Sequence, residues 1–249
     1  MSKRALIVGY GNIGRKLAKE YSKLNPDIYD PWKGYDIKNE PYDIAFIAVD
    51  TPMKVNGICD LSQVKSAISE TDAEIIVLRS TVPPGTTDQF IKETGKHIVF
   101  SPEFYGTTQH SDEKLYNFDF TILGGDQKDS EKVAQTLQEC YNCTHRFCFT
   151  DSKTAELTKY FENAMLAAKV SLCIQFYQLA QQFGVNYSEM RELLLQDQRF
   201  NRSHTFVYED HPYWDSHCLN KDMAAIANFG DAELIKAVIK FNEHCKNLK

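Results

Sequence analysis

In the first half of the chain, short runs of apolar residues alternate with longer stretches in which apolar residues recur every three or four positions. The short runs predict buried strands, and the longer stretches predict amphipathic helices. We expect strands at residues 4–9, 27–29, 43–49, 74–78, 97–100 and 120–123, and helices at 13–24, 61–69, 87–94 and 130–141. Such alternation predicts parallel βαβ units and therefore an α/β fold built on a doubly wound Rossmann sheet.

The pattern changes after Asp151. Residues 152–183 contain almost no helix-breaking residue and predict one long helix. A shorter helix at 188–196, an aromatic and polar loop, and a last helix at 232–245 follow. We therefore expect two domains, a Rossmann domain at 1–150 and a smaller all-helical domain at 151–249. The long helix exceeds what one small domain easily covers, and its open apolar face predicts a homodimer.

Composition and charge narrow the possible partners. The net charge of −6 provides no basic field for nucleic acid or for an anionic membrane surface. No apolar run is long enough to span a bilayer, and the apolar run at the N-terminus is too short for a signal peptide. An odd number of cysteines, seven in 249 residues, does not suit a disulfide framework. These features predict a cytoplasmic protein that binds neither nucleic acid nor membranes.

The segment Gly9-Tyr10-Gly11-Asn12-Ile13-Gly14 is a G-x-G-x-x-G motif between a predicted strand and a predicted helix. In that context the first glycine makes a tight turn and the second lets a pyrophosphate approach the backbone. The third allows close packing of helix and strand, and the phosphate then lies at the helix N-terminus. The motif predicts a dinucleotide site; the alternatives are a turn without a ligand and a turn that binds FAD.

Asp30 lies about 20 residues after the glycines, at the end of the second predicted strand. An acid at this place accepts hydrogen bonds from the hydroxyls of the adenosine ribose, and its charge repels a 2′-phosphate. NAD is therefore the expected cofactor rather than NADP. Lys33 is near enough in sequence to weaken that preference.

Polar segments follow several later strands, at the edge where open α/β sheets bind ligands. They include Thr51-Pro52, Ser80-Thr81 and Ser101-Pro102-Glu103. Lys159 and Asn163 are four residues apart on the long helix and so share a face. Further along, Cys218 precedes the acid Asp222 by four residues.

Together these segments resemble the UDP-glucose/GDP-mannose dehydrogenase family. The matching motifs, from residue 4 to about 230, are VGYGNIG, the TP after the third strand, STVPPGTT, SPEF, AELTKYFENAMLAAKVS, DQRF and CLNKD. The resemblance implies an NAD-dependent oxidoreductase that converts the C6 alcohol of a nucleotide sugar into a carboxylate, with UDP-glucose as the default substrate. It also implies that Gly9, Gly11, Asn12, Ile13, Gly14, Asp30, Thr51, Pro52 and Thr81 contact the cofactor.

The resemblance further implies the catalytic roles. Lys159, with Asn163 beside it, suits the removal of the C6 hydroxyl proton or the stabilisation of the alkoxide. Cys218 suits the second oxidation, because a thiolate adds to the aldehyde and forms first a thiohemiacetal and then a thioester. Thr81, Glu103 and Asp222 match positions that hold and activate the hydrolytic water. Glu103, Lys159, Asn163 and Arg199 match substrate contacts, and Arg199 reaches the sugar from a partner subunit.

Two features depart from the family pattern. Residues 208–217, just before Cys218, contain no glycine, whereas family members carry a glycine-rich stretch there. Tyr213 and Trp214 in this segment either stack on a base or sugar ring or pack against the protein. The chain also stops about where a third, nucleotide-binding domain begins in typical members, which predicts a short form and leaves the sugar nucleotide open.

Other hypotheses compete with this interpretation. A two-electron 3-hydroxyacid-type dehydrogenase shares the Lys-x-x-x-Asn helix, but it needs no cysteine at position 218. A non-catalytic NAD-binding module fits the missing domain but not the combination of candidate catalytic residues. Cys140, Cys143, His145 and Cys148 resemble a zinc site, but one C-x-x-C is common by chance, so we expect no metal.

Overall fold

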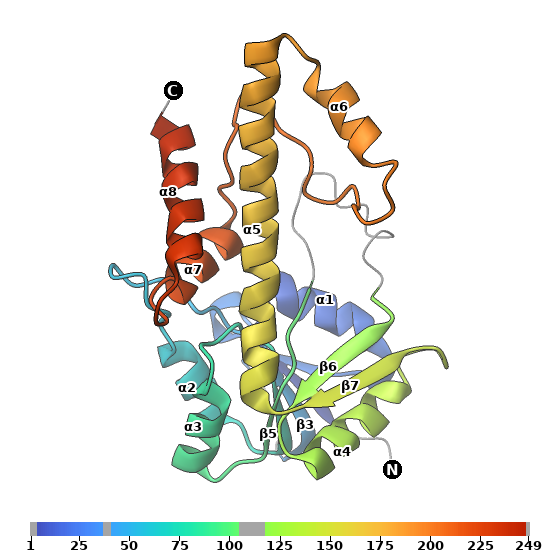
Figure 1. Cartoon of the computed structure of the whole chain (residues 1–249). Coiled ribbons are helices and arrows are strands. Elements are labelled where there is room, and N and C mark those ends of the chain that lie inside the picture. The colour runs from blue at the N-terminus through green and yellow to red at the C-terminus, as the bar shows by residue number, and fades with distance from the viewer. Residues whose placement is uncertain (1–3, 37–40, 105–117, 248–249) are drawn as a thin grey trace. The chain divides into compact units, whose positions relative to one another are not determined.

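A computed structural model describes residues 4–36, 41–104 and 118–247 of the chain (Figure 1). The described part forms two compact units. The first comprises the residues up to Pro52 together with Cys59–Lys159, and the second comprises Met53–Ile58 and the residues from Tyr160 onwards. The long helix therefore contributes residues to both units. Among the described residues, no helix is both long and apolar enough to cross a membrane.

The first unit is built on a seven-stranded sheet whose order is β2-β1-β3-β4-β5-β6-β7. The chain reverses direction across the sheet between β1 and β3, which is where doubly wound folds bind ligands. The strands are β1 Ala5–Val8, β2 Asp27–Tyr29, β3 Tyr42–Ile47, β4 Ala73–Leu78, β5 Ile98–Phe100, β6 Phe120–Gly124 and β7 Arg146–Thr150. The predicted α/β Rossmann class is confirmed, but β6 pairs with β5 in the antiparallel direction.

Helices cover both faces of this sheet. Strand residues such as Leu6, Ile47 and Leu78 pack with α2 Ser62–Glu70 and α3 Thr86–Thr94 on one face. Their neighbours in sequence, such as Ile7 and Phe46, pack with α1 Asn12–Glu20 and α4 Gln127–Gln138 on the other. Because side chains alternate between the faces of a strand, strands covered on both sides are apolar almost throughout.

Three elements of this unit differ from the prediction. Helix α1 ends at Glu20 rather than 24, and a separate 3₁₀ turn covers Ser22–Leu24. Helix α4 begins at Gln127 rather than 130, because the Asp126 carboxylate accepts hydrogen bonds from the N–H groups of Lys128 and Asp129 and caps the helix earlier. Strand β7 was not predicted. Its central residues Phe147, Cys148 and Phe149 are apolar, but it lies at the edge of the sheet and most of its side chains are exposed.

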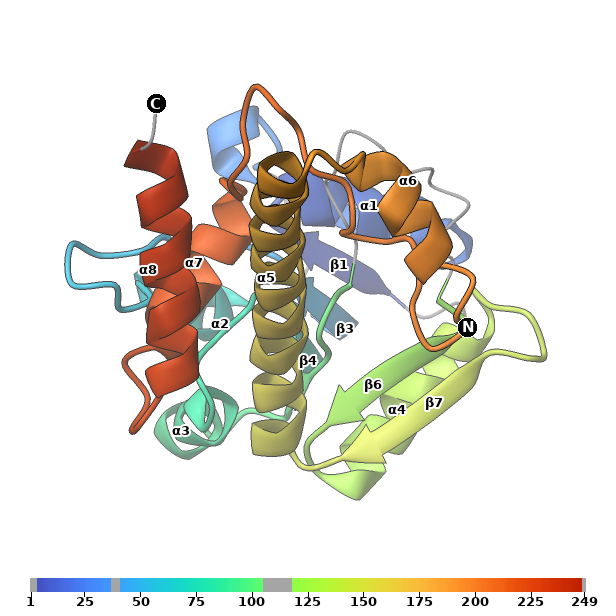
Figure 2. The same cartoon turned by 45° about the horizontal axis from the view of Figure 1, so that its top comes forward.

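The second unit is helical. It contains most of α5 Ser152–Phe183, whose predicted bounds are confirmed, and α6 Tyr187–Leu194, α7 His217–Ile226 and α8 Glu233–Asn247. Figure 2 shows α7 and α8 beside α5. Their shared core contains Ala167 of α5, Met223 of α7 and Ile239 of α8. Helix α7 falls where the sequence predicted a loop.

Candidate active site

The turn between β1 and α1 has the backbone shape that its glycines require. Gly9 adopts φ +91°, and a Cβ added there would lie 2.7 Å from the Ala48 carbonyl oxygen. A Cβ on Gly14 would lie 1.9 Å from the Gly9 carbonyl oxygen, whereas one on Gly11 would meet nothing within 4 Å. Helix α1 begins at Asn12, and no side chain caps its first turn. The turn therefore offers an open helix N-terminus that fits a dinucleotide pyrophosphate.

Asp30 follows β2 and contacts this glycine turn directly. Its Oδ2 accepts a hydrogen bond of 2.8 Å from the Tyr10 N–H, and the residue is largely buried. The Lys33 ammonium lies 3.2 Å from the same oxygen and donates to the Tyr10 carbonyl at 3.0 Å. The structure thus brings Asp30 and Lys33 together at the glycine turn.

The ends of β3 and β4 are joined by hydroxyl groups. The buried Thr51 hydroxyl donates to the Thr81 carbonyl at 3.0 Å, and the Ser80 hydroxyl donates to the Val49 carbonyl at 2.6 Å. Pro52, beside Thr51, is exposed. Two neighbouring parallel strands therefore carry Thr51 and Thr81 to the same edge of the sheet, next in order to the glycine turn.

Arg79 is a buried cation that the sequence did not single out. It follows β4, is 5% exposed, and donates from Nη1 to the Ser101 hydroxyl at 2.6 Å. Burial disfavours its charge, but Tyr21, Glu20 and other acidic neighbours, Glu103 among them, outweigh that effect and raise its pKa. Arg79 thus links the end of β4, which carries Thr81, to the Ser101–Glu103 segment after β5.

Lys159 lies next to that same segment. Its Nζ is 5.2 Å from the centre of the Phe104 ring, and both Lys159 and Glu103 are almost fully buried. A cation over an aromatic face is attracted by the ring quadrupole. The structure therefore brings Lys159 beside the SPEF segment, although the two are more than 50 residues apart in the chain.

Glu156, one turn before Lys159 on α5, organises the STVPPGTT segment. Its Oε1 accepts from the N–H and the hydroxyl of Thr87 at 2.8 and 2.7 Å, and its Oε2 accepts from the Gly85 N–H at 2.5 Å. These groups belong to the first turn of α3, where N–H groups lack partners within the helix. Burial raises the pKa of Glu156, while the hydrogen bonds from Thr87 and Gly85 lower it. The sequence analysis did not single out Glu156, although it lies on the same helix as Lys159 and three residues before it.

In the second unit, α7 carries Cys218 and Asp222 one turn apart. The Ser216 hydroxyl accepts from the Leu219 N–H and caps the helix, so Cys218 lies in its first turn and is exposed. Asp222 is 2% exposed. Its Oδ2 accepts from the Asn163 amide at 2.6 Å, and its Oδ1 pairs with the Lys221 ammonium at 2.5 Å. Asn163 of α5 is therefore joined to the helix of Cys218, and Lys221 is a buried partner that the sequence did not single out.

The glycine-free segment before α7 is anchored by Trp214. The indole is buried and donates to the Ser171 hydroxyl at 2.9 Å. The buried Asn242 side chain of α8 accepts from the Trp214 N–H and donates to its carbonyl, both at 2.9 Å. Of the two possibilities left open for this aromatic residue, packing is the one found. Tyr213 stacks on His211 with ring centres 4.7 Å apart.

Arg199 and the cysteine-rich segment around His145 both contact residues that are near them in the structure. Arg199 is exposed and forms an ion pair with Asp197, with 2.5 Å between Nη2 and Oδ2. His145, of the cysteine-rich segment, stacks on Tyr141 and its Nε2 lies 2.9 Å from the Thr121 hydroxyl. Within the ranges that the structure describes, no three histidine, cysteine or acidic residues gather as a metal site would require.

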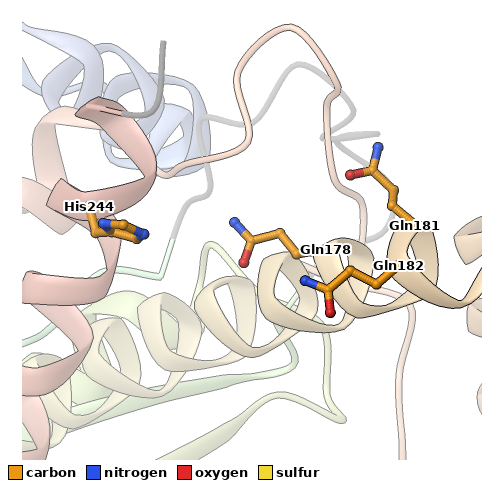
Figure 3. A pocket seen from close by; sticks show the side chains of 4 residues that line it. All are labelled: Gln178, Gln181, Gln182 and His244. Carbon is orange, nitrogen blue, oxygen red and sulfur yellow. The ribbon is translucent and has the colours of Figure 1, made fainter.

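An open depression of about 520 Å³ lies beside α5 in the second unit. Figure 3 shows Gln178, Gln181 and Gln182 of α5 and His244 of α8 around it. The Gln178 amide also donates to the Cys245 sulfur at 3.6 Å. None of the candidate cofactor-binding or catalytic residues lines this depression, so it is not the candidate active site.

Two sequence profiles of one protein family match the chain. The profile of the UDP-glucose/GDP-mannose dehydrogenase family NAD binding domain matches residues 33–144, and that of the family's central domain matches residues 153–244. The chain is 30% identical to the UDP-glucose 6-dehydrogenase of Rickettsia conorii, over 84% of this chain and 51% of that protein. It is also 30% identical to the UDP-N-acetyl-D-mannosamine dehydrogenase of Methanocaldococcus jannaschii, over 83% and 49%.

A similar structure is that of a UDP-glucose dehydrogenase from the archaeon Pyrobaculum islandicum. It has a TM-score of 0.78 and 22% identity, with 98% of this chain and 68% of that chain covered. At this identity the likeness concerns the fold. The chain spans about half the length of the curated relatives that it matches.

Proposed function

Because the chain belongs to the UDP-glucose/GDP-mannose dehydrogenase family and has its NAD-binding domain, we propose that it oxidises the C6 alcohol of a nucleotide sugar to a carboxylate. In this proposal residues 1–150 are the NAD-binding domain and 151–249 the helical central domain, and UDP-glucose is the default substrate. The observation that carries it is the hydrogen bond between Asn163 and Asp222, because it joins the two helices that bear Lys159 and Cys218. The seven unbridged cysteines suit a reducing, cytoplasmic setting.

The glycine turn and Asp30 would hold the cofactor. The open N-terminus of α1 would bind its pyrophosphate and Asp30 its adenosine ribose. When bound, NAD accepts hydride from the C6 carbon of the sugar. Thr51, Pro52 and Thr81 are placed on the neighbouring strands, where open α/β sheets bind the rest of such a cofactor.

Lys159 and Asn163 would act in the first oxidation. The C6 hydroxyl must lose its proton as the carbon is oxidised, and an ammonium with an amide nearby stabilises the alkoxide. Asp222 would orient the Asn163 amide rather than take a proton, since both of its oxygens already accept hydrogen bonds from buried donors. Lys221 neutralises the Asp222 charge that this arrangement buries.

Cys218 would act in the second oxidation. Its exposed thiolate adds to the C6 aldehyde, and the resulting thiohemiacetal loses the second hydride to become a thioester. The first turn of a helix favours negative charge, which suits a thiolate and the oxyanion that forms beside it. Water then cleaves the thioester, and Thr81 and Glu103 would hold and activate this water. Each sugar oxidised in this way yields two NADH.

A homodimer completes the proposal. In the part of α5 that belongs to the second unit, five large apolar residues are 48–79% exposed and spaced by four and seven positions: Phe161, Met165, Leu172, Phe176 and Phe183. Residues spaced in this way share one helix face, and such a stripe is typical of helix–helix association. We propose that the stripe pairs with a second copy and that Arg199 reaches the partner's sugar.

The proposal is tested by screening NADH production with UDP-, GDP- and TDP-sugars and with 3-hydroxyacids. We expect turnover with at least one nucleotide sugar and two NADH per sugar oxidised. One NADH per molecule of a 3-hydroxyacid would replace the proposal with the two-electron reaction. Binding of NADH without turnover of any substrate would reduce the chain to an NAD-binding module. Thermal shift detects binding in the same plate, because a ligand of the folded state raises the melting temperature.

A further inference from the structure

Two cations converge on one carbonyl of the glycine turn. The Tyr10 carbonyl accepts from the Lys33 ammonium at 3.0 Å and from Arg15 Nη1 at 3.5 Å. Arg15 Nη2 also donates to the Asn12 side chain at 2.9 Å. With Asp30 as the acid, these three side chains place two positive charges and one negative charge around Tyr10. In a protein of net charge −6, this local excess of positive charge favours an anionic ligand.

The turn that carries Lys33 is held rigidly by its backbone. The N–H of Asp30 donates to the Tyr35 carbonyl at 2.8 Å, and the Tyr35 N–H donates back at 3.1 Å. Between them lie a 3₁₀ turn at Pro31–Lys33 and Gly34 at φ +79°. The Tyr35 ring packs edge-on against the Tyr10 ring, with centres 5.0 Å apart. Lys33 is therefore presented to the ribose end of the site by a preformed element.

An unaccompanied acid at this position repels a phosphate on the adenosine 2′-oxygen and makes a site specific for NAD. Here the acid is already neutralised, because Lys33 Nζ lies 3.2 Å from Asp30 Oδ2. The lysine side chain is 44% exposed, so its ammonium is able to leave Asp30 for a phosphate. The Tyr10 N–H would continue to hold Asp30 in place.

We propose that Lys33, supported by Arg15, lets this site also accept an adenosine with a 2′-phosphate, so that the chain binds NADP(H) as well as NAD(H). The inference rests on the proposed dinucleotide site in the glycine turn. Lys33 is then a specificity-determining residue: Asp30 favours a ribose with a free 2′-hydroxyl, and Lys33 binds a 2′-phosphate.

The test compares 5′-AMP with 2′,5′-ADP, which is adenosine 2′,5′-bisphosphate, by isothermal titration, since these probes differ only in the 2′-phosphate. For the unmodified chain we expect dissociation constants within about tenfold of each other. Lys33→Met should weaken the binding of 2′,5′-ADP by at least about tenfold and that of 5′-AMP by less than about twofold. Adding Arg15→Met should weaken 2′,5′-ADP further. Lys132→Met, which removes a lysine paired with an acid at the surface, should change neither constant.

Tryptophan fluorescence gives a second readout. Of the two tryptophans, Trp32 is 98% exposed and lies two residues from Asp30, whereas Trp214 is buried. NADPH and NADH should both quench the emission, Trp32→Phe should remove most of that change, and Lys33→Met should weaken the NADPH titration selectively.

The inference is overturned if Lys33→Met weakens both probes equally, because Lys33 would then act on a part that they share. It is also overturned if 2′,5′-ADP does not bind at concentrations at which 5′-AMP saturates, and the dinucleotide site would stand in that case. Failure of both probes to bind would remove the dinucleotide site and this inference together.

Discussion

At the scale of single residues, the proposed catalytic groups differ most in exposure. Cys218 is accessible, as a nucleophile that attacks a bound aldehyde must be. Asp222 is buried and accepts a hydrogen bond from the buried Asn163 amide, which suits a group that orients its neighbour. Breaking a buried ion pair such as that of Asp222 and Lys221 typically costs about 3–5 kcal/mol, so changes there would disturb the fold as well as the chemistry.

Substitution of Cys218 is the sharpest test of the thioester step. Serine is nearly the same size, but its oxygen adds to an aldehyde less readily and would form a slowly hydrolysed ester. Cys218→Ser should therefore lower steady-state turnover by at least about a thousandfold while the melting temperature stays unchanged. Lys159→Ala should instead block the first oxidation, so that no aldehyde-level species forms in a single-turnover experiment.

Cys143→Ser is the matched control, because it removes another exposed thiol that the proposal does not use. It should leave turnover and stoichiometry as they are. Full activity of Cys218→Ser, together with one NADH per substrate molecule, would contradict the thioester mechanism and favour the 3-hydroxyacid reaction.

At the scale of elements, α5 combines three tasks. Glu156 in its first turns holds the start of α3, Lys159 and Asn163 provide polar groups for the proposed chemistry, and the exposed stripe from Phe161 to Phe183 offers a surface for association. A single continuous helix fixes the spacing of these groups along its axis at 1.5 Å per residue. A change of length within α5 would therefore disturb all three tasks.

We expect the chain to form a dimer of two 28.6 kDa copies through the exposed stripe of α5. The double variant Leu172→Glu/Phe176→Glu places charges on that stripe and forfeits the burial of two large apolar side chains in each copy. Burial of such a side chain contributes about 1.5–3 kcal/mol, so dimer affinity should fall at least about a hundredfold. Light scattering over a concentration series measures the mass.

Gln181→Glu provides the control for charge alone, because Gln181 is exposed on the opposite face of the same helix. That variant should remain dimeric. If the unmodified protein has the mass of a single chain at micromolar concentration, the dimer prediction is wrong, and so is the proposal that Arg199 acts in a partner subunit.

At the scale of the whole molecule, buried ionisable groups couple folding to pH. Glu20, at the end of α1, accepts a hydrogen bond from the Tyr141 hydroxyl, and its other oxygen, Oε2, is buried with no hydrogen-bond partner in the described part of the chain. Burial raises the pKa of Glu20 above its usual 4.5, against the lowering effect of Arg79 and Tyr141. Folding therefore favours the protonated form of this carboxyl.

The sign of the effect on stability follows from linkage. An acid whose pKa is raised by folding stabilises the folded state at low pH, and this contribution is lost as the pH rises through the folded-state pKa. Glu20→Gln removes the ionisation, so the decrease in melting temperature between pH 5 and pH 7.5 should be smaller in the variant. Thermal unfolding across that range measures it.

Glu74→Gln serves for comparison, because Glu74 forms an exposed ion pair with Lys132. Its melting temperatures should follow the pH dependence of the unmodified protein. Parallel curves for Glu20→Gln and the unmodified protein would show that Glu20 does not couple folding to pH in this range.

Much of the fold follows from local pattern. The strand at 27–29 and the helix at 152–183 have the predicted bounds, because the turn-forming residues on either side of the strand and the uninterrupted run of helix-forming residues are local signals. The glycine turn was equally readable, since Gly9 and Gly14 occupy places that no other residue fits. The family and its cofactor followed from motifs of this kind, and the comparisons confirm both.

Helix α7 shows where local pattern was not enough. Its cap at Ser216 and its pair of alanines were visible, but the surrounding aromatic and polar residues indicated a loop. Trp214 takes its buried place through Ser171 and Asn242, which lie 43 and 28 residues away. The antiparallel direction of β6 likewise depends on which strand lies beside it, and no residue within β6 encodes that.

The sequence by itself determined most of the strands and helices, the glycine turn with its acid, and the family and its cofactor, because each depends on residue types at short, regular spacings. Only the tertiary structure decided which distant side chains form hydrogen bonds around the glycine-rich and catalytic segments. Glu156 reaches Gly85 across 71 residues, Arg79 reaches Ser101 across 22, and Asn163 reaches Asp222 across 59. Such pairs arise because a buried polar group must find a partner wherever packing places one, and packing depends on the whole chain.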